Sequence, residues 1–152
     1  MRREDAFQAL EGLLRSGRPC LVEVRGVSME PFLHAGDKVQ VEAADPEGLV
    51  PGELIAFQED GCLIVHRFAG WTGRGGERRL RQTGDNMPGY KLLDPRDLLG
   101  RVTAVERGGR RRRLDRGWPL AACRLRGWGL LAGASLRQRL GPLKRALLGR
   151  NR

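Results

Sequence analysis

The chain has 152 residues, which is enough to bury one hydrophobic core and too few for two ordinary domains. It carries 28 Lys and Arg residues against 18 Asp and Glu residues, and this formal net charge of +10 favours an anionic partner such as a membrane surface. Aromatic residues make up only 5% of the chain, too few for a base-stacking platform, so nucleic acid is not an expected partner.

The N-terminal segment has the spacing of a short amphipathic helix within residues 1–17. Its apolar residues recur every three or four positions, and Gly17 followed by Pro19 ends the pattern. The residues that carry the pattern are Ala6, Phe7, Leu10, Leu13 and Leu14.

From residue 18 the apolar residues follow the period of β-strands, in short runs at 21–24, 39–41, 54–57, 63–65 and 99–105. Asp60-Gly61, between two of these runs, predicts a two-residue hairpin turn. The Gly/Arg-rich segment 71–81 reads as a loop. We therefore predict a mainly β domain over residues 18–107.

The last part of the chain, residues 108–152, is basic. Arg110 to Arg113 form a charged run, and leucines return after Trp118 at mixed helical spacing among further arginines. We predict a basic, partly helical tail, which could either rest on an anionic membrane surface or cover its own domain.

The cysteines Cys20, Cys62 and Cys123 show neither a CxxC pair nor the Cys/His spacing of zinc ligands. We therefore expect no disulfide framework, no metal and no cofactor. Acidic residues occupy the N-terminus, where a signal peptide needs an apolar run, and no stretch of about 18 residues is apolar and uncharged. This pattern favours a cytoplasmic protein without a transmembrane helix.

One stretch carries candidate chemistry, the hexapeptide from Gly26 to Pro31 with Ser28 near its middle. A serine nucleophile needs a sharp turn that exposes its hydroxyl to a base and to backbone N–H groups. The same pattern is also typical of a serine that hydrogen-bonds its own backbone, so the hexapeptide alone leaves both interpretations open.

The order of the boxes along the chain adds a resemblance. Ser-Met-x-Pro, Gly-Asp, Pro-Gly-Glu-Leu-Ile-Ala-Phe, Val-His-Arg, Thr-Gly-Asp-Asn and Leu-Gly-Arg-Val occur in sequence between residues 24 and 105. This series resembles the signal peptidase family, and within it the archaeal and endoplasmic-reticulum branch. The resemblance implies a signal-peptidase/LexA-like coiled antiparallel β fold and endopeptidase cleavage after small residues.

The resemblance also assigns roles. Ser28 matches the family nucleophile, and His66 of the Val-His-Arg box stands where this branch has its general base. Related enzymes use a lysine there, but no lysine lies between Lys38 and Lys91. A histidine can stay unprotonated near neutral pH without burial, as a base must.

The third member of the site is less determined. Asp85 matches the aspartate of the family's Gly-Asp-Asn box and is the expected acid that orients His66. Relatives carry a further aspartate about six residues later, where this chain has Lys91, with Asp94 three residues beyond. Asp94 is therefore an alternative acid, and a Ser28–His66 dyad without an acid is the third possibility.

Other residues near the serine have expected minor roles. Gly26 replaces the hydroxyl residue that can donate to the oxyanion in relatives, which leaves the backbone N–H of Ser28 as the main expected donor. Met29 and Pro31 are expected beside the substrate. The second histidine, His34, is expected to be exposed.

Two further residues have structural expectations only. Asp37 is expected to fix the turn that it forms with Gly36, and Arg67 is expected to make a surface ion pair or to orient a neighbouring loop.

The sequence therefore favours a serine endopeptidase that acts on a peptide or protein substrate through an acyl-enzyme on Ser28. Two alternatives stay open at this stage. One is a catalytically weak or inactive peptide-binding module of the same fold, and the other is a membrane or nucleic-acid binder driven by the basic tail.

Overall fold

The computed structural model describes residues 3–115 and residue 125. Its elements, in chain order, are α1 (Arg3–Arg15), β1 (Cys20–Glu23), β2 (Lys38–Glu42), the short 3-10 helix η1 (Pro46–Gly48), β3 (Leu54–Glu59), β4 (Cys62–Thr72), η2 (Gly75–Glu77), β5 (Arg79–Thr83), β6 (Lys91–Leu93), η3 (Pro95–Asp97), β7 (Leu98–Arg107) and β8 (Arg110–Arg113). The protein is thus mainly β with an N-terminal helix, as the sequence predicted.

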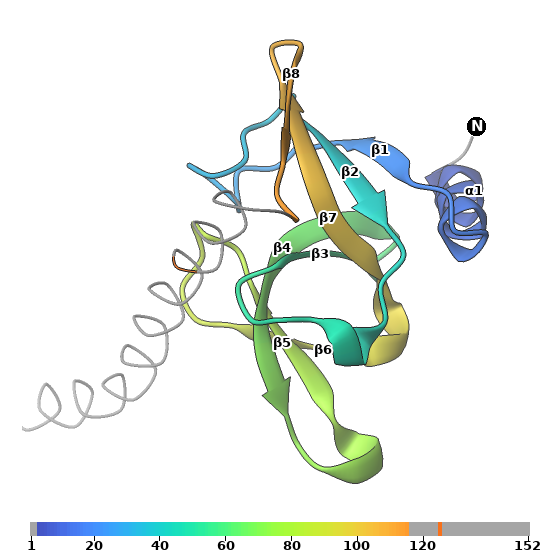
Figure 1. Ribbon diagram of the computed structural model, residues 1–152. Helices are drawn as coiled ribbons and strands as arrows, with labels where there is room; N and C mark the ends of the chain where they lie inside the picture. The colour runs from blue at the N-terminus through green and yellow to red at the C-terminus, as the bar shows by residue number, and fades with distance from the viewer. Residues whose placement is uncertain (1–2, 116–124, 126–152) are drawn as a thin grey trace, which may run out of the picture.

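The strands form one antiparallel sheet in the order β1-β2-β7-β3-β4-β5-β6, and β8 pairs with β7. The sheet curls on itself into an open half-barrel, with α1 beside the start of β1 (Figure 1). Most neighbouring strands follow one another in the chain, but β7 lies between β2 and β3. Three strands therefore lie between β1 and β4 in the sheet, and these two strands, which flank the candidate serine, approach each other through the curvature of the sheet.

The hairpin between β3 and β4 confirms the turn expected at Asp60-Gly61. Both residues have positive φ angles, 51° for Asp60 and 70° for Gly61, as the tight hairpin turns that match strand twist require. The hairpin sets the register of β4, in which His66 lies opposite Ile55 and Arg67 lies opposite Leu54.

The expected loop over 71–81 is wrong at both ends. β4 continues to Thr72, and β5 begins at Arg79 and pairs with it in antiparallel register. The two most buried residues of β5 are Leu80, which is apolar, and Gln82, which is polar and 1% exposed. Because one of the inward positions is polar, the alternation that marks a strand is hidden in the sequence.

The start of the predicted tail also belongs to the sheet. Residues Arg110–Arg113 form β8, and Leu114 after it is buried and donates its N–H to the Thr103 carbonyl at 2.8 Å. A strand of four exposed arginines has no apolar alternation, so its sequence carries no strand signal. The predicted tail helix lies outside the described residues.

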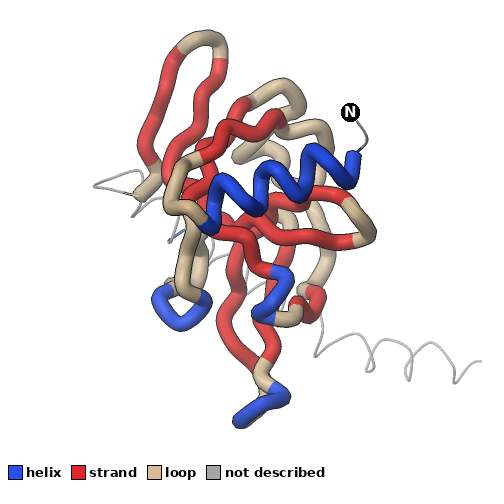
Figure 2. Tube along the Cα trace, turned by 90° about the vertical axis from the view of Figure 1, so that its right-hand side faces the viewer, coloured by secondary structure: helices blue, strands red, loops and turns tan. Residues whose placement is uncertain are grey.

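The curled sheet separates two clusters of buried apolar side chains. One contains Met29, Leu33 and Val39 and is covered by α1 through Leu14, which is 2% exposed. Figure 2 shows α1 lying across the front of the strands. The second cluster contains Phe57. His66 lies beside it, and the centroids of the Phe57 and His66 rings are 5.8 Å apart. Among the described residues, no helix is long and apolar enough to cross a membrane.

Candidate active site

Ser28 and His66 meet at the junction between the segment after β1 and the middle of β4. His66 Nε2 lies 2.9 Å from Ser28 Oγ, although 38 residues separate them in sequence. His66 is 5% exposed, and Ser28 is half-buried in the turn that follows the strand. The residues that the resemblance paired are therefore within hydrogen-bonding distance, as a nucleophile and its base must be.

The other ring nitrogen of His66 faces a residue that the sequence did not single out. His66 Nδ1 lies 2.6 Å from Gln82 Oε1 on the neighbouring strand β5. An amide oxygen only accepts hydrogen bonds, so Nδ1 carries the proton and the lone pair of Nε2 points at Ser28. This is the tautomer that a general base requires, and a neutral side chain selects it.

Burial of the imidazole also favours its basic form. Desolvation lowers the pKa of His66 below its ordinary value of 6.5, and the hydrogen bond to Gln82 opposes part of this change. The neutral ring therefore persists at pH values below those at which an exposed histidine would be protonated.

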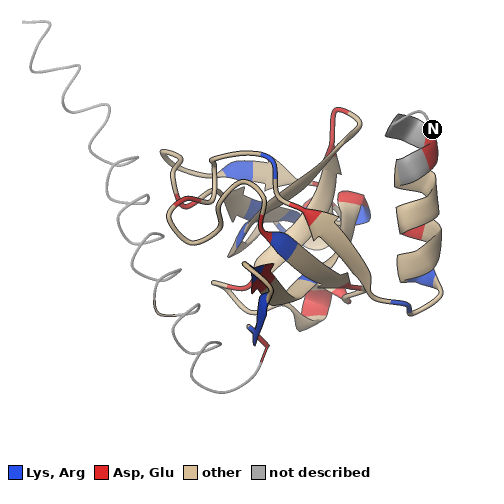
Figure 3. Ribbon diagram, turned by 90° about the horizontal axis from the view of Figure 1, so that it is seen from above, with Lys and Arg blue, Asp and Glu red and all other residues tan. Residues whose placement is uncertain are grey.

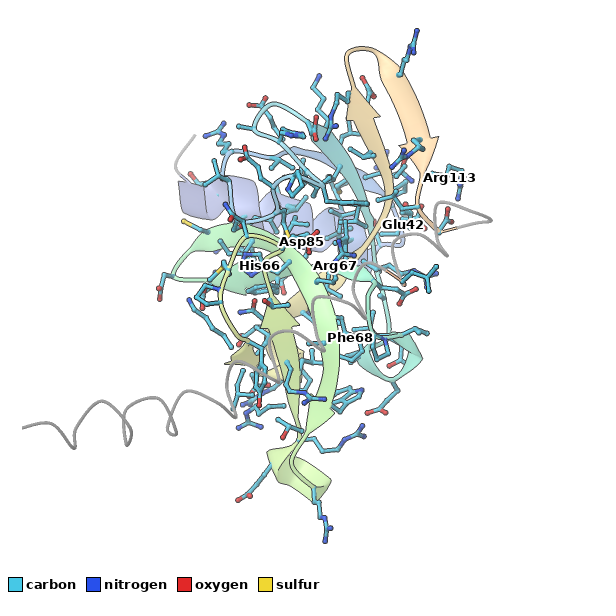
Figure 4. All side chains as sticks on the ribbon, turned by 90° about the vertical axis from the view of Figure 1, so that its left-hand side faces the viewer. Glu42, His66, Arg67, Phe68, Asp85 and Arg113 are labelled. Atoms are coloured by element: carbon cyan, nitrogen blue, oxygen red, sulfur yellow. The ribbon has the colours of Figure 1, made fainter. Side chains whose placement is uncertain are left out.

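Asp85 does not occupy the position expected of it. Its two carboxylate oxygens accept hydrogen bonds from Arg67, at 2.7 Å from Nε and 2.6 Å from Nη2. The side chains of Arg67 and Asp85 are 0% and 1% exposed, so the pair is buried, and the expectation of a surface ion pair for Arg67 was wrong. Figure 4 shows Asp85, His66 and Arg67 close together, with His66 and Arg67 adjacent on β4. The partner of His66 is Gln82, while Asp85 neutralises the arginine next to it.

Arg67 connects the separate sequence boxes. Besides Asp85, its guanidinium donates to the Gly52 carbonyl at 2.7 Å and lies over the ring of Phe32, 5.1 Å from its centroid. Gly52 belongs to the Pro-Gly-Glu box, Asp85 to the Gly-Asp-Asn box, and Phe32 to the loop that carries Ser28. A buried guanidinium needs all of these partners, because an unpaired one would be costly.

The Gly-Asp-Asn box holds the serine loop through its other two residues as well. A Cβ atom on Gly84 would lie 2.5 Å from the Ser28 carbonyl oxygen, so only glycine fits there. The N–H of Asn86 donates to the same carbonyl at 2.8 Å, and the Asn86 amide donates to the Val27 carbonyl at 3.4 Å. Gly84 and Asn86 thus fix the position of Ser28 relative to the end of β5, and Asp85 holds Arg67 of β4.

A second ion pair holds the far end of the serine loop. Asp37 is 3% exposed and accepts from Arg107 at 2.7 Å and 2.5 Å, and also from the N–H of His34 at 2.9 Å. The hydrogen bonds from Arg107 lower the pKa of Asp37 below its ordinary 3.8. The expectation that Asp37 fixes its turn is confirmed, and so is the exposure of the His34 side chain.

Asp94, the alternative acid, is not part of the site. Its carboxylate caps η3 by accepting the N–H of Arg96 at 3.0 Å, and the Arg96 and Arg79 side chains hold it. The hydrogen bond from the Arg96 side chain is the main cause that lowers the pKa of Asp94 to about 2. The residue of β5 that faces His66 is Gln82. Asp94 follows Leu93, which pairs with Leu80, two residues before Gln82 on β5.

Lys91 lies beside the site without entering it. It pairs with Gln82 across β5 and β6, and its ammonium group lies 3.6 Å from the carboxylate of Glu59. Position 91 is therefore close to the residue that contacts His66, and it holds an exposed lysine.

The backbone N–H of Ser28 is available as a hydrogen-bond donor. The Ser28 N–H has no acceptor within residues 3–115. Gly26 is exposed, and a Cβ atom added to it would meet no atom of a more distant residue within 4 Å. Pro31 is exposed, while Met29 is 2% exposed and packs in the core beneath the serine. Met29 also lines the groove described next.

A groove of about 660 Å³ leads to Ser28. Its two long sides are residues 21–26, from β1 onward, and residues 61–65, at the start of β4. β1 pairs with β2 alone, and Cys62–His66 pair with β3 alone, because the pairing of β4 with β5 begins at Arg67. Two unpaired strand edges therefore face the groove.

Within the part of the chain that the structure describes, no group of three or more His, Cys, Asp and Glu side chains is arranged to hold a metal ion. Comparison of the sequence with protein-family models and with curated proteins found no match.

Proposed function

We propose that the protein is a serine endopeptidase of the signal-peptidase type, with Ser28 as nucleophile, His66 as general base and Gln82 as the residue that positions His66. The observation that carries this proposal is the 2.9 Å contact between Ser28 Oγ and a buried His66 whose other nitrogen donates to Gln82. The order of sequence boxes that resembles this family supports it independently.

The chemistry follows from these atoms. Ser28 Oγ attacks the scissile carbonyl carbon while its proton passes to His66 Nε2, and the Ser28 N–H donates to the oxyanion. The C–N bond then breaks, and His66 returns the proton to the leaving amine. Water attacks the resulting ester with His66 as base again, and the proton ends on Ser28 Oγ as the acid product leaves.

The groove supports a peptide as the substrate. An extended peptide can add its backbone hydrogen bonds to exposed strand edges, which is a common mode of peptide recognition. The edges of β1 and of Cys62–His66 flank the groove, and the groove ends at Ser28. We place the enzyme in a reducing compartment such as the cytoplasm, since Cys20 and Cys62 are free thiols.

Labelling with a small fluorophosphonate, followed by intact mass, tests the proposal. The parent protein is expected to gain one adduct, mapped to Ser28, and Ser28→Ala is expected to gain none. His66→Ala should label at least about 100-fold more slowly, the range that a lost general base costs. His34→Ala is the matched control, because its side chain is exposed, and it should label like the parent.

An inert parent protein would contradict the proposal and leave a peptide-binding module of the same fold as the better interpretation. Equal labelling of the parent and His66→Ala would remove His66 as the base.

A further inference from the structure

The groove beside Ser28 has a wall that comes from outside the sheet. Phe7 and Leu10 of α1 line it together with residues of β1 and β4, and both side chains are half-buried. Leu14, one turn further along the same helix face, is 2% exposed in the core and anchors α1 against the sheet. The side chains of Phe7 and Leu10 are therefore held at the groove by the packing of the helix.

The part of α1 at the groove is uncharged. No charged residue lies between Asp5 and Glu11, and Figure 3 shows this stretch of the helix without basic or acidic colour. The charged residues that line the groove, Glu23 and Arg25, are exposed at its rim. A charged side chain placed against this part of α1 would lose hydration and meet no charged group between Asp5 and Glu11, so this wall of the groove disfavours it.

The floor of the groove is apolar as well. Four half-buried residues pack against the core and line the groove from its two sides: Val22, Val24, Leu63 and Val65. They alternate along their segments, as side chains on one face of a strand do. In an extended peptide bound between the two strand edges, every second side chain would point into the groove, where it would contact these four residues and α1.

The groove has room for a bulky side chain. Its volume of about 660 Å³ lies within the roughly 300–1,000 Å³ of sites that enclose drug-sized ligands. A methyl group would bury less apolar surface against α1 and the valines and leucine of the groove than a larger apolar side chain would.

We propose that Phe7 and Leu10 of α1 determine specificity, by forming a subsite that selects a bulky apolar side chain of an extended peptide substrate. The inference rests on the proposed function for the nature of the substrate. It assigns to α1 a role in recognition in addition to its packing on the core.

Binding to the full-length Ser28→Ala protein tests the inference without relying on catalysis. The probes are fluorescent octapeptides of Gly and Ser in which one Ala, Leu or Phe occupies each position in turn, and fluorescence anisotropy gives the affinities. At one position, Leu or Phe should bind at least about tenfold more tightly than Ala, the discrimination typical of an apolar pocket. Phe7→Ala and Leu10→Ala, each added to Ser28→Ala, should lose most of this preference.

Leu13→Ala is the matched control, since Leu13 lies on the same helix, is 40% exposed and does not line the groove. It should keep the preference of the parent. Leu10→Phe preserves an apolar helix and narrows the groove, so it should shift the preference from Phe toward smaller side chains even if Leu10→Ala folds poorly.

The inference is overturned if no position prefers Leu or Phe to Ala, or if the preference survives both Phe7→Ala and Leu10→Ala. Failure of the proposed function looks different: the parent protein would stay unlabelled by the fluorophosphonate while the apolar preference and its dependence on α1 persist.

Discussion

Two arginine–aspartate pairs hold the segment around Ser28, and they differ mainly in their contact with water. The side chains of Arg67 and Asp85 are 0% and 1% exposed, whereas the side chain of Arg107 is 52% exposed and that of its partner Asp37 is 4% exposed. Both arginines donate to both carboxylate oxygens, so hydrogen-bond geometry does not distinguish the pairs.

This difference in burial determines how much the loss of each pair should cost. Removing one member of a fully buried pair leaves a charge without water or partner, whereas a half-exposed arginine can be replaced in part by solvent. Arg67 follows His66 directly in β4, and its partner Asp85 adjoins Gly84, which touches Ser28. The buried pair therefore couples the stability of the fold to the position of the nucleophile, and the outer pair secures only the end of its loop.

The largest effect is expected from Arg67→Ala. Leaving Asp85 buried without its guanidinium should lower the free energy of unfolding by about 3–5 kcal/mol, measured by urea denaturation. The double variant Arg67→Leu/Asp85→Leu should recover much of that loss, because it removes both charges, but it should not recover fluorophosphonate labelling. A single variant as stable as the parent would show that the pair is not buried in solution.

Gly84→Ala tests the contact between the Gly-Asp-Asn box and the nucleophile. Its Cβ cannot occupy a position 2.5 Å from the Ser28 carbonyl, so the serine loop must shift. A displacement of that kind costs about 100-fold in rate, which labelling kinetics will measure. Gly76→Ala is the control, because a Cβ there meets no atom within 4 Å, and it should label at the parent rate.

Arg107→Ala addresses the outer pair. It should lower the free energy of unfolding by about 1–2 kcal/mol, since Asp37 keeps the hydrogen bond from the His34 N–H. The folded-state pKa of Asp37 is lowered, so its contribution is present above pH 3.8 and is lost as the pH falls through the folded-state value. Arg107→Ala should flatten that acid dependence. A loss as large as that of Arg67→Ala would contradict the contrast between the pairs.

Gln82→Glu tests the neutral partner of His66 through the pH dependence of labelling. The rate at which the fluorophosphonate labels the parent protein should rise with pH and reach half of its maximum below pH 6.5. The reason is that burial lowers the pKa of His66 and the neutral ring is the active base. A carboxylate at position 82 favours the imidazolium and should raise this midpoint by about one pH unit or more. An unchanged midpoint would show that residue 82 does not contact His66.

The sequence predicted the parts of the site that repeat a family pattern and missed those that depend on tertiary packing. Ser28 and His66 could be paired because their boxes occur in order, and Asp60-Gly61 fixed the hairpin that carries His66. Gln82 has no local signal, since a glutamine in a short polar strand looks like a surface residue. Its role depends on which strand lies next to β4.

The burial of the charged pair Arg67 and Asp85 could not be predicted from the sequence either. Arg67 in the Val-His-Arg box looked like a surface residue, yet the curl of the sheet brings Gly52, Phe32 and Asp85 around it. The same curvature brings the serine loop to β4, so only the folded arrangement shows that Asp85 serves the arginine and not the histidine. Membership of the signal peptidase family stays a prediction from the order of the boxes.

Trapping the covalent intermediate tests the role of Ser28 as nucleophile most directly. The parent protein is mixed with the nitrophenyl ester of a short apolar peptide, quenched in acid within milliseconds to seconds, and analysed by intact mass and peptide mapping. We expect one acyl group on Ser28 that forms in the parent protein and not in Ser28→Ala. Ester turnover without an adduct on Ser28, or an adduct on the exposed thiol of Cys62, would contradict it.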